Sequence, residues 1–295
     1  MRVHVREALG RRRLVAPVLA LLVSCSSGPG PAPEVSLAGA KTRDQLQAVL
    51  ESISARSDTP AMMARARIYA RLRDLEGAVS PTLLALGDAS DLDVLSHGSS
   101  SDAREESATR LARHFRERAE NPVLSRSSFP GHLGETLRRI VLLTISSFYS
   151  EVASRKELIE SLEKLSKASL ELAEREALSP EAVRIWRKRS RAASDRATEL
   201  GREEGPVDPS PEPRKFCEYE PERHLEEGTR AADLGTREKA DRAEAEGVLQ
   251  WYLLALSHYG VVRETSAALT PAQEHALAAQ EIVVRSLCDM LCREP

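Results

Sequence analysis

Four of the Ser-Pro and Thr-Pro pairs in this chain mark helix starts, and they constrain its fold more than any other feature of the sequence. The pairs are Thr59-Pro60, Ser80-Pro81, Ser179-Pro180 and Thr270-Pro271. A hydroxyl group before a helix accepts hydrogen bonds from free N–H groups, and proline fits the first turn, where its missing N–H is no loss. Between the pairs the sequence shows no sustained apolar–polar alternation and no Asn-Gly or Asp-Gly turn, which are the signals of strands and hairpins. The pattern therefore predicts an all-α fold.

The spacing of apolar residues and breakers predicts where the helices lie. Helices are expected at about 41–57, 60–78, 101–120, 132–153, 155–178, 180–203, 222–234, 236–263 and 271–292. Residues 80–100 are expected to be irregular or to contain a short helix. Residues 204–221 hold five prolines, so they are expected to form a loop and a possible boundary within the helical domain.

Two neighbouring segments carry apolar or small residues that alternate in steps of three and four. The first seam comprises Leu158, Leu162, Leu165, Ser169 and Leu172, and the second comprises Val183, Trp186, Ser190, Ala193, Ala197 and Leu200. Such seams bury one helix against another, and the short connection between them favours antiparallel packing. The sequence thus predicts a multi-helix bundle with a long antiparallel αα-hairpin over about residues 155–203. The segments 140–149 and 248–256 are apolar on most sides and are expected to form the main core in contact with each other.

The N-terminus has the charge pattern of an export signal. Five arginines precede an uncharged run of eleven residues, Leu14–Ser24, against a single acid, Glu7. A membrane-spanning helix needs about 20 apolar residues, so this run is too short to span a bilayer. A positive segment followed by a short apolar run is typical of a secretion signal.

The run ends in Leu22-Val23-Ser24-Cys25, which resembles the lipobox of bacterial lipoprotein signal peptides. The resemblance covers only residues 1–25 and identifies no family for the remaining domain. It implies that residues 1–24 are removed, that the thiol of Cys25 receives a diacylglyceryl group and that the new amine receives an acyl chain such as palmitate. Ser26, rather than Asp, follows the cysteine, which in the sorting rule for such lipoproteins implies the periplasmic face of the outer membrane. Two or more acyl chains anchor a protein stably to a membrane.

Residues 25–40 are predicted to form the lipidated cysteine and a flexible tether, because they are rich in Gly, Pro, Ser and Ala. Fully extended, this segment reaches about 50 Å. Residues 41–295 are then the helical domain.

Three further cysteines, Cys217, Cys288 and Cys292, would meet an oxidising compartment after export. Cys288 and Cys292 lie one helical turn apart with nearly parallel side chains, which is poor geometry for a bond between them. We therefore expect a disulfide between Cys217 and either Cys288 or Cys292. The spacing of the three thiols and His224 matches no zinc pattern, so no metal and no cofactor are predicted.

Three groups of residues in the sequence partly match catalytic or metal-binding motifs. Ser161 and Lys164 form Ser-x-x-Lys, the nucleophile motif of serine β-lactamases, but the Ser-x-Asn and Lys-Thr-Gly elements are missing from the sequence, so a surface helix is expected. His224 and Glu227 are expected at a solvated helix start. A loop or helix cap is expected for the aspartates that precede His97, which are Asp88, Asp91 and Asp93. No catalytic residue is predicted.

A cluster of basic residues in the segment 180–203 bears on the possible binding partners of the protein. Arg184, Arg187, Lys188, Arg189 and Arg191 surround Trp186, either as the solvated flank of the seam or as a surface for lipid phosphates or an acidic partner. The net charge of −3 and the aromatic content of 4% give no support to nucleic-acid binding.

From these features we expect a membrane-anchored envelope lipoprotein that acts as a non-enzymatic helical scaffold or protein-interaction module, with another envelope protein as partner. The alternatives are a carrier of an apolar ligand in a helical cavity and an enzyme of unfamiliar type.

Overall fold

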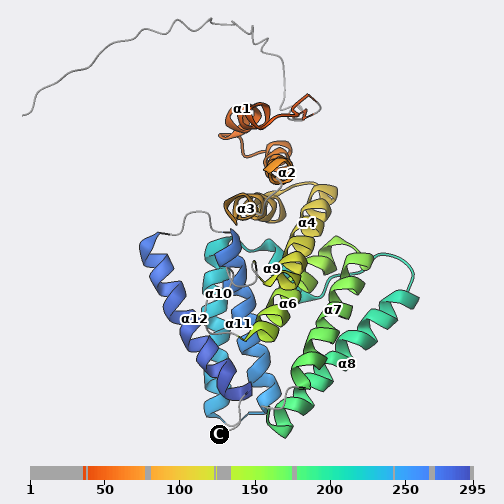
Figure 1. The fold of residues 1–295 in the computed structure, drawn as a ribbon, viewed down its shortest axis with the longest axis vertical. Helices are drawn as coiled ribbons and strands as arrows, with labels where there is room; N and C mark the ends of the chain where they lie inside the picture. The colour runs from red at the N-terminus through yellow and green to blue at the C-terminus, as the bar shows by residue number, and fades with distance from the viewer. Residues whose placement is uncertain are drawn as a thin grey trace, which may run out of the picture. The chain divides into compact units, whose positions relative to one another are not determined.

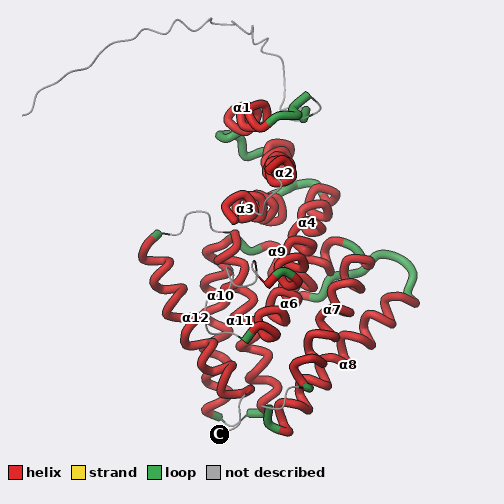
Figure 2. The backbone as a smooth tube through the Cα atoms, viewed as in Figure 1, coloured by secondary structure: helices red, strands yellow, loops and turns green. Residues whose placement is uncertain are grey.

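Helices make up nearly all of the described chain, and no strand occurs in it, as the all-α prediction requires (Figures 1 and 2). The computed structural model describes residues 36–37, 39–76, 81–122, 124, 134–174, 178–241, 243–265 and 270–292, without the side chains of Pro81 and residues 287–292. The helices are α1 (Arg43–Ile53), α2 (Thr59–Glu76), α3 (Pro81–His97), α4 (Ser101–Glu120), α6 (Glu135–Ala153), α7 (Arg155–Ala173), α8 (Pro180–Arg202), α9 (Pro211–Glu218), α10 (Pro221–Ala240), α11 (Ala245–Thr265) and α12 (Pro271–Cys292). They belong to one compact unit, Pro33–Pro295.

The expected helix starts are confirmed in two places and refined in a third. Ser179 accepts a hydrogen bond from the N–H of Ala182, so it caps α8, and Pro180 occupies the first turn. Thr270 caps α12 in the same way, since its hydroxyl accepts from the N–H of Gln273. At α2 the cap is Asp58, whose Oδ1 lies 3.1 Å from the N–H of Ala61. Ser80 lies outside the described residues.

The predicted αα-hairpin is present as α7 and α8. The Arg155 guanidinium donates to the Leu200 carbonyl at 2.6 Å, and the Ser166 hydroxyl donates to the Ser190 carbonyl at 2.9 Å. Residue numbers rise along one helix as they fall along the other, so the two helices run antiparallel. Trp186 is completely buried in the seam, as its position in the step pattern predicted.

Three expected boundaries are wrong. Residues 80–100 were expected to be irregular or to contain a short helix, but α3 is a helix of 17 residues over Pro81–His97. Buried Leu92, Leu95 and two aspartates gain partners there that outweigh the weak helix propensity of this stretch. The predicted loop at 204–221 contains α9, whose prolines stand in the first turn, where they cost no backbone hydrogen bond. The break expected beside Gly235 lies at residues 241–244 instead.

The expected core is confirmed. Residues of α6 and α11 share one buried cluster with residues of α4, and α6 contacts both of these helices. Ile140, Leu142, Tyr252 and Leu256 are all completely buried there. No described helix is long and apolar enough to cross a membrane.

Helices α10 and α11 approach each other closely because α10 presents two glycines to two tyrosines. A methyl group built on Gly228 would lie 2.6 Å from Cε1 of Tyr259, and one built on Gly235 would lie 2.8 Å from Cε1 of Tyr252. The glycines are seven residues apart, so they lie on one face of the helix. This contact positions the outer face of α10, on which the grooves described below are found.

Candidate functional site

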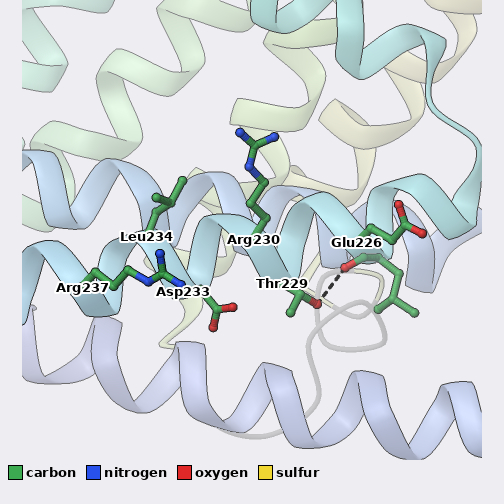
Figure 3. A pocket seen from close by; sticks show the side chains of 7 residues that line it. Glu226, Thr229, Arg230, Asp233, Leu234 and Arg237 are labelled. Atoms are coloured by element: carbon green, nitrogen blue, oxygen red, sulfur yellow. Dashed lines mark hydrogen bonds between the residues drawn. The ribbon is translucent and has the colours of Figure 1, made fainter.

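A groove of about 640 Å³ runs along the exposed side of α10 next to α12. In Figure 3, Thr229 and Asp233 point to one side of α10, whereas Arg230 and Leu234 point to the other. The Thr229 hydroxyl lies 3.0 Å from Oε1 of Gln280 in α12, which places its side of the groove against that helix. The described residues that line it are Leu225, Glu226, Thr229, Arg230, Asp233, Leu234 and Arg237.

A second groove, of about 350 Å³, lies on the other side of α10, between α9 and α11. Its described lining comprises Glu212, Lys215, Tyr219, Arg223, Glu227, Arg230, Ala231, Leu234, Trp251 and Leu254. The two grooves share Arg230 and Leu234. They therefore adjoin along α10, and we call them together the α10 surface.

Opposite charges alternate along the α10 surface. Arg223 contacts Glu226 at 2.9 Å and Glu227 at 2.5 Å, and Arg230 lies 3.5 Å from Glu227. The guanidinium of Arg223 also lies 5.6 Å above the Tyr219 ring. A surface that mixes both charges with leucine side chains has the composition of a protein interface rim and not that of a phosphate-binding surface.

Behind the second groove lies a buried pair of histidines. Nδ1 of His224 and Nδ1 of His258 are 2.8 Å apart, and the rings of Phe216 and Tyr219 pack against both. Burial lowers the pKa of His258 to about 3 and, together with its neighbour, lowers the pKa of His224 well below its usual range. Both rings are therefore neutral, and one donates to the other. The predicted solvated helix start at His224 and Glu227 is wrong for the histidine, which is completely buried.

A second buried cluster centres on Asp88 in α3. Asp88 contacts Nδ1 of His114 at 2.7 Å and the Arg118 guanidinium at 2.6 Å, and Arg118 reaches Glu264 of α11 at 2.8 Å. Arg73 lies 2.7 Å from Nε2 of His114, and since a guanidinium only donates, the Nδ1–H of His114 donates to Asp88. Burial alone would raise the pKa of Asp88, but the charge of Arg118 and the hydrogen bonds that Asp88 accepts from His114 and Arg118 outweigh it and lower that pKa. The cluster ties α2, α3, α4 and α11 together.

Asp91 has a similar role one turn further along α3. It is almost completely buried and contacts the Arg110 guanidinium at 2.6 Å. Burial raises the pKa of Asp91 more than Arg110 lowers it, and burial also raises the pKa of Asp93. The loop or cap predicted for these aspartates is therefore wrong, because all of them stand within the helix that ends at His97.

The Ser-x-x-Lys motif is not on the surface as predicted. Ser161 is completely buried, and its hydroxyl lies 2.9 Å from the hydroxyls of both Ser146 and Ser150 and 3.0 Å from the Arg116 guanidinium. Lys164 pairs with glutamates of α4 and α7. The hydroxyl of Ser161 is thus hydrogen-bonded inside the contact between α4, α6 and α7, which gives the motif a packing role.

The predicted cysteine sites are only partly covered by the structure. Cys25 lies outside the described residues, so its lipidation stays a prediction. Cys217 is a free, completely buried thiol with its Sγ 3.8 Å from the Phe148 carbonyl, and burial raises its pKa. The side chains of Cys288 and Cys292 are not described, so the disulfide also stays a prediction. Among the described residues, no group of three potential metal ligands occurs.

Comparisons of the chain with protein families, with curated proteins and with solved structures gave no match.

Proposed function

We propose that this protein is a lipid-anchored helical interaction module of the bacterial envelope, which binds another envelope protein along the α10 surface. The observation that carries the proposal is the pair of adjoining grooves that share Arg230 and Leu234. Grooves beside an amphipathic helix suit a helical or extended partner segment, with apolar side chains supplying affinity and the surrounding charges selecting the partner.

The membrane attachment in this proposal rests on Cys25 and its resemblance to a lipoprotein cleavage site. The tether 25–40 would let the body reach about 50 Å from the membrane, far enough to meet a partner in the periplasm. The outer membrane is the proposed location because Ser26 follows the cysteine.

Two alternatives receive less support. A carrier of apolar ligands would need room between α6 and α11, but Ile140, Leu142 and Leu256 are completely buried in one shared cluster there. An enzyme would need accessible polar groups, whereas the Asp88 and His224 clusters are enclosed by the helices that they connect. We therefore favour structural roles for both clusters.

The proposal is tested by capture from detergent-solubilised membranes with the tagged full-length protein as bait. Leu234→Arg alters the leucine that both grooves share. Leu170→Arg is the matched control, since Leu170 is an exposed leucine of α7. We expect the wild type and Leu170→Arg to capture the same protein and Leu234→Arg to lose it at least tenfold, about 1.4 kcal/mol.

Circular dichroism of each variant checks that it is folded. Recovery of no specific protein, or equal recovery by all variants, would overturn the proposal.

A further inference from the structure

The N-terminal half of α8 carries a stripe of four exposed basic side chains. The basic stripe comprises Arg184, Arg187, Lys188 and Arg191. Between Arg184 and Arg191 the helix advances seven residues, or about 10 Å. The stripe is thus a compact row of positive charge on one helix.

Helical geometry directs this row away from the rest of the protein. The buried side of α8 faces α7 through Trp186, Ser190 and Ala193. At about 100° per residue, the centre of the basic stripe lies on the opposite side of the helix from these residues. The charges therefore point outward from the α7–α8 hairpin.

Few carboxylates neutralise the stripe. Among the residues that the structure describes, Arg187 and Arg191 have no carboxylate within the ion-pair distance of 4.0 Å. Arg184 lies 4.0 Å from Glu181, and Lys188 lies 2.8 Å from Glu246. The side chains of Arg184 and Lys188 are both more than half exposed. Ion pairs at such exposed positions are weak, so they leave the basic stripe available to a partner.

From this arrangement we infer that the basic stripe docks on an anionic phospholipid surface. Protein interfaces depend on exposed aromatic or aliphatic anchors, but the tryptophan of this segment, Trp186, is completely buried, and Arg189 stacks over its ring at 5.8 Å. The exposed neighbours of the stripe on α8 are small, such as Ala192 and Ser194, or acidic, such as Asp195, and none carries a large apolar side chain. A row of cations without such anchors fits lipid phosphates better than it fits an acidic protein.

The choice of a membrane rests in part on the proposed function, because a lipid on Cys25 would hold the body within tether reach of a bilayer. A lipid anchor and a basic patch strengthen each other, because either attachment keeps the protein at the membrane where the other can bind. Docking through the stripe would orient the α7–α8 hairpin on the bilayer.

The test uses the full chain with Cys25→Ser, so that no lipid anchor contributes, and measures its sedimentation with vesicles. Vesicles of phosphatidylcholine with phosphatidylglycerol are compared with vesicles of phosphatidylcholine alone, at low and at high salt. The variant Arg187→Gln/Arg191→Gln removes the two unpaired charges. Arg196→Gln/Arg202→Gln is the control, because it removes two charges from the same helix outside the stripe.

We expect the stripe variant to bind the anionic vesicles about thirtyfold more weakly than its parent, since each basic side chain near an anionic surface contributes about a fivefold factor. The control should lose far less, and high salt should weaken the binding of the parent protein. Equal losses in the two variants, no preference for anionic vesicles, or binding of the stripe to an acidic protein instead would overturn the inference. The assay needs neither a lipid anchor nor a partner protein, so its failure is distinct from failure of the proposed function.

Discussion

Substitution of Gly228 by alanine tests whether the close approach of α10 and α11 is a real constraint of the fold. The added methyl group would lie 2.6 Å from Cε1 and 2.9 Å from Cδ1 of Tyr259, and 3.2 Å from Cβ of His258. Carbon atoms in contact prefer about 3.5–4.0 Å, so the ring or the helix must move by about 1 Å. Tyr259 is completely buried, which leaves its ring little room to yield.

Two opposing effects set the magnitude. Alanine in a helix interior is favoured over glycine by about 0.8–1 kcal/mol. Forcing an extra carbon into a well-packed contact costs about 1–3 kcal/mol and at this distance belongs at the upper end. We therefore expect Gly228→Ala to be destabilised by about 1–2 kcal/mol. This corresponds to a decrease in Tm of about 2–8 °C for a domain of this size class.

The matched control is Gly87→Ala, in the interior of α3. A methyl group there would lie 3.5 Å from Cβ of Tyr69, an ordinary contact distance, so the gain in helix propensity should leave this variant as stable as the wild type or more so. Urea and thermal unfolding, followed by circular dichroism, measure both variants. If Gly228→Ala proves no less stable than Gly87→Ala, the claim that α10 needs a glycine at this contact is refuted.

Three further predictions concern charge and covalent chemistry. Because the pKa of His258 falls from 6.5 to about 3 on folding, its contribution to stability is complete above pH 6.5. This contribution to the free energy of unfolding is lost as the pH falls from 6.5 toward 3, by about 1.4 kcal/mol per pH unit. Urea titrations that give the same free energy of unfolding between pH 6.5 and pH 3 would contradict the prediction. Asp88→Asn should cost about 3–5 kcal/mol by removing the buried carboxylate charge that pairs with Arg118, whereas Asp208→Asn, whose side chain is 92% exposed, should change stability by less than about 0.5 kcal/mol. Similar unfolding midpoints for the two variants would refute the buried ion pair. Intact-mass measurement of the membrane fraction should show a chain that starts at Cys25 with attached lipid and gains the mass of two hydrogen atoms on reduction. A lipid-free mass would exclude the anchor, and an unchanged mass would exclude the disulfide of Cys217.

Local sequence signals predicted the parts of the fold that depend on local chemistry. The cap at Ser179 and the seam through Trp186 follow from hydrogen bonding and spacing within a few residues. The same signals underestimated α3, where an irregular segment or a short helix was expected in place of the full helix Pro81–His97. There the helix is stabilised by burial against distant helices, which no local pattern reports.

The candidate site could be predicted only in part. The basic residues of α8 are visible in the sequence, but their outward direction depends on which side of α8 meets α7. So does the absence, among the described residues, of a carboxylate beside Arg187 and Arg191. The α10 surface could not be anticipated at all, since its grooves arise where α9, α11 and α12 flank α10. Gly235 lay at an expected helix break, and no sequence signal indicated that it would pack against Tyr252.

The sequence by itself determined the helical class and the αα-hairpin, because propensity, capping and apolar spacing act between near neighbours. Only the tertiary structure decided which polar residues lie inside. His114 lies 26 residues from Asp88, and His258 lies 34 residues from His224. Burying a carboxylate or a histidine costs free energy unless a partner forms a hydrogen bond or ion pair with it. Here the partners come from distant parts of the sequence, so only the packing of the helices brings them into contact.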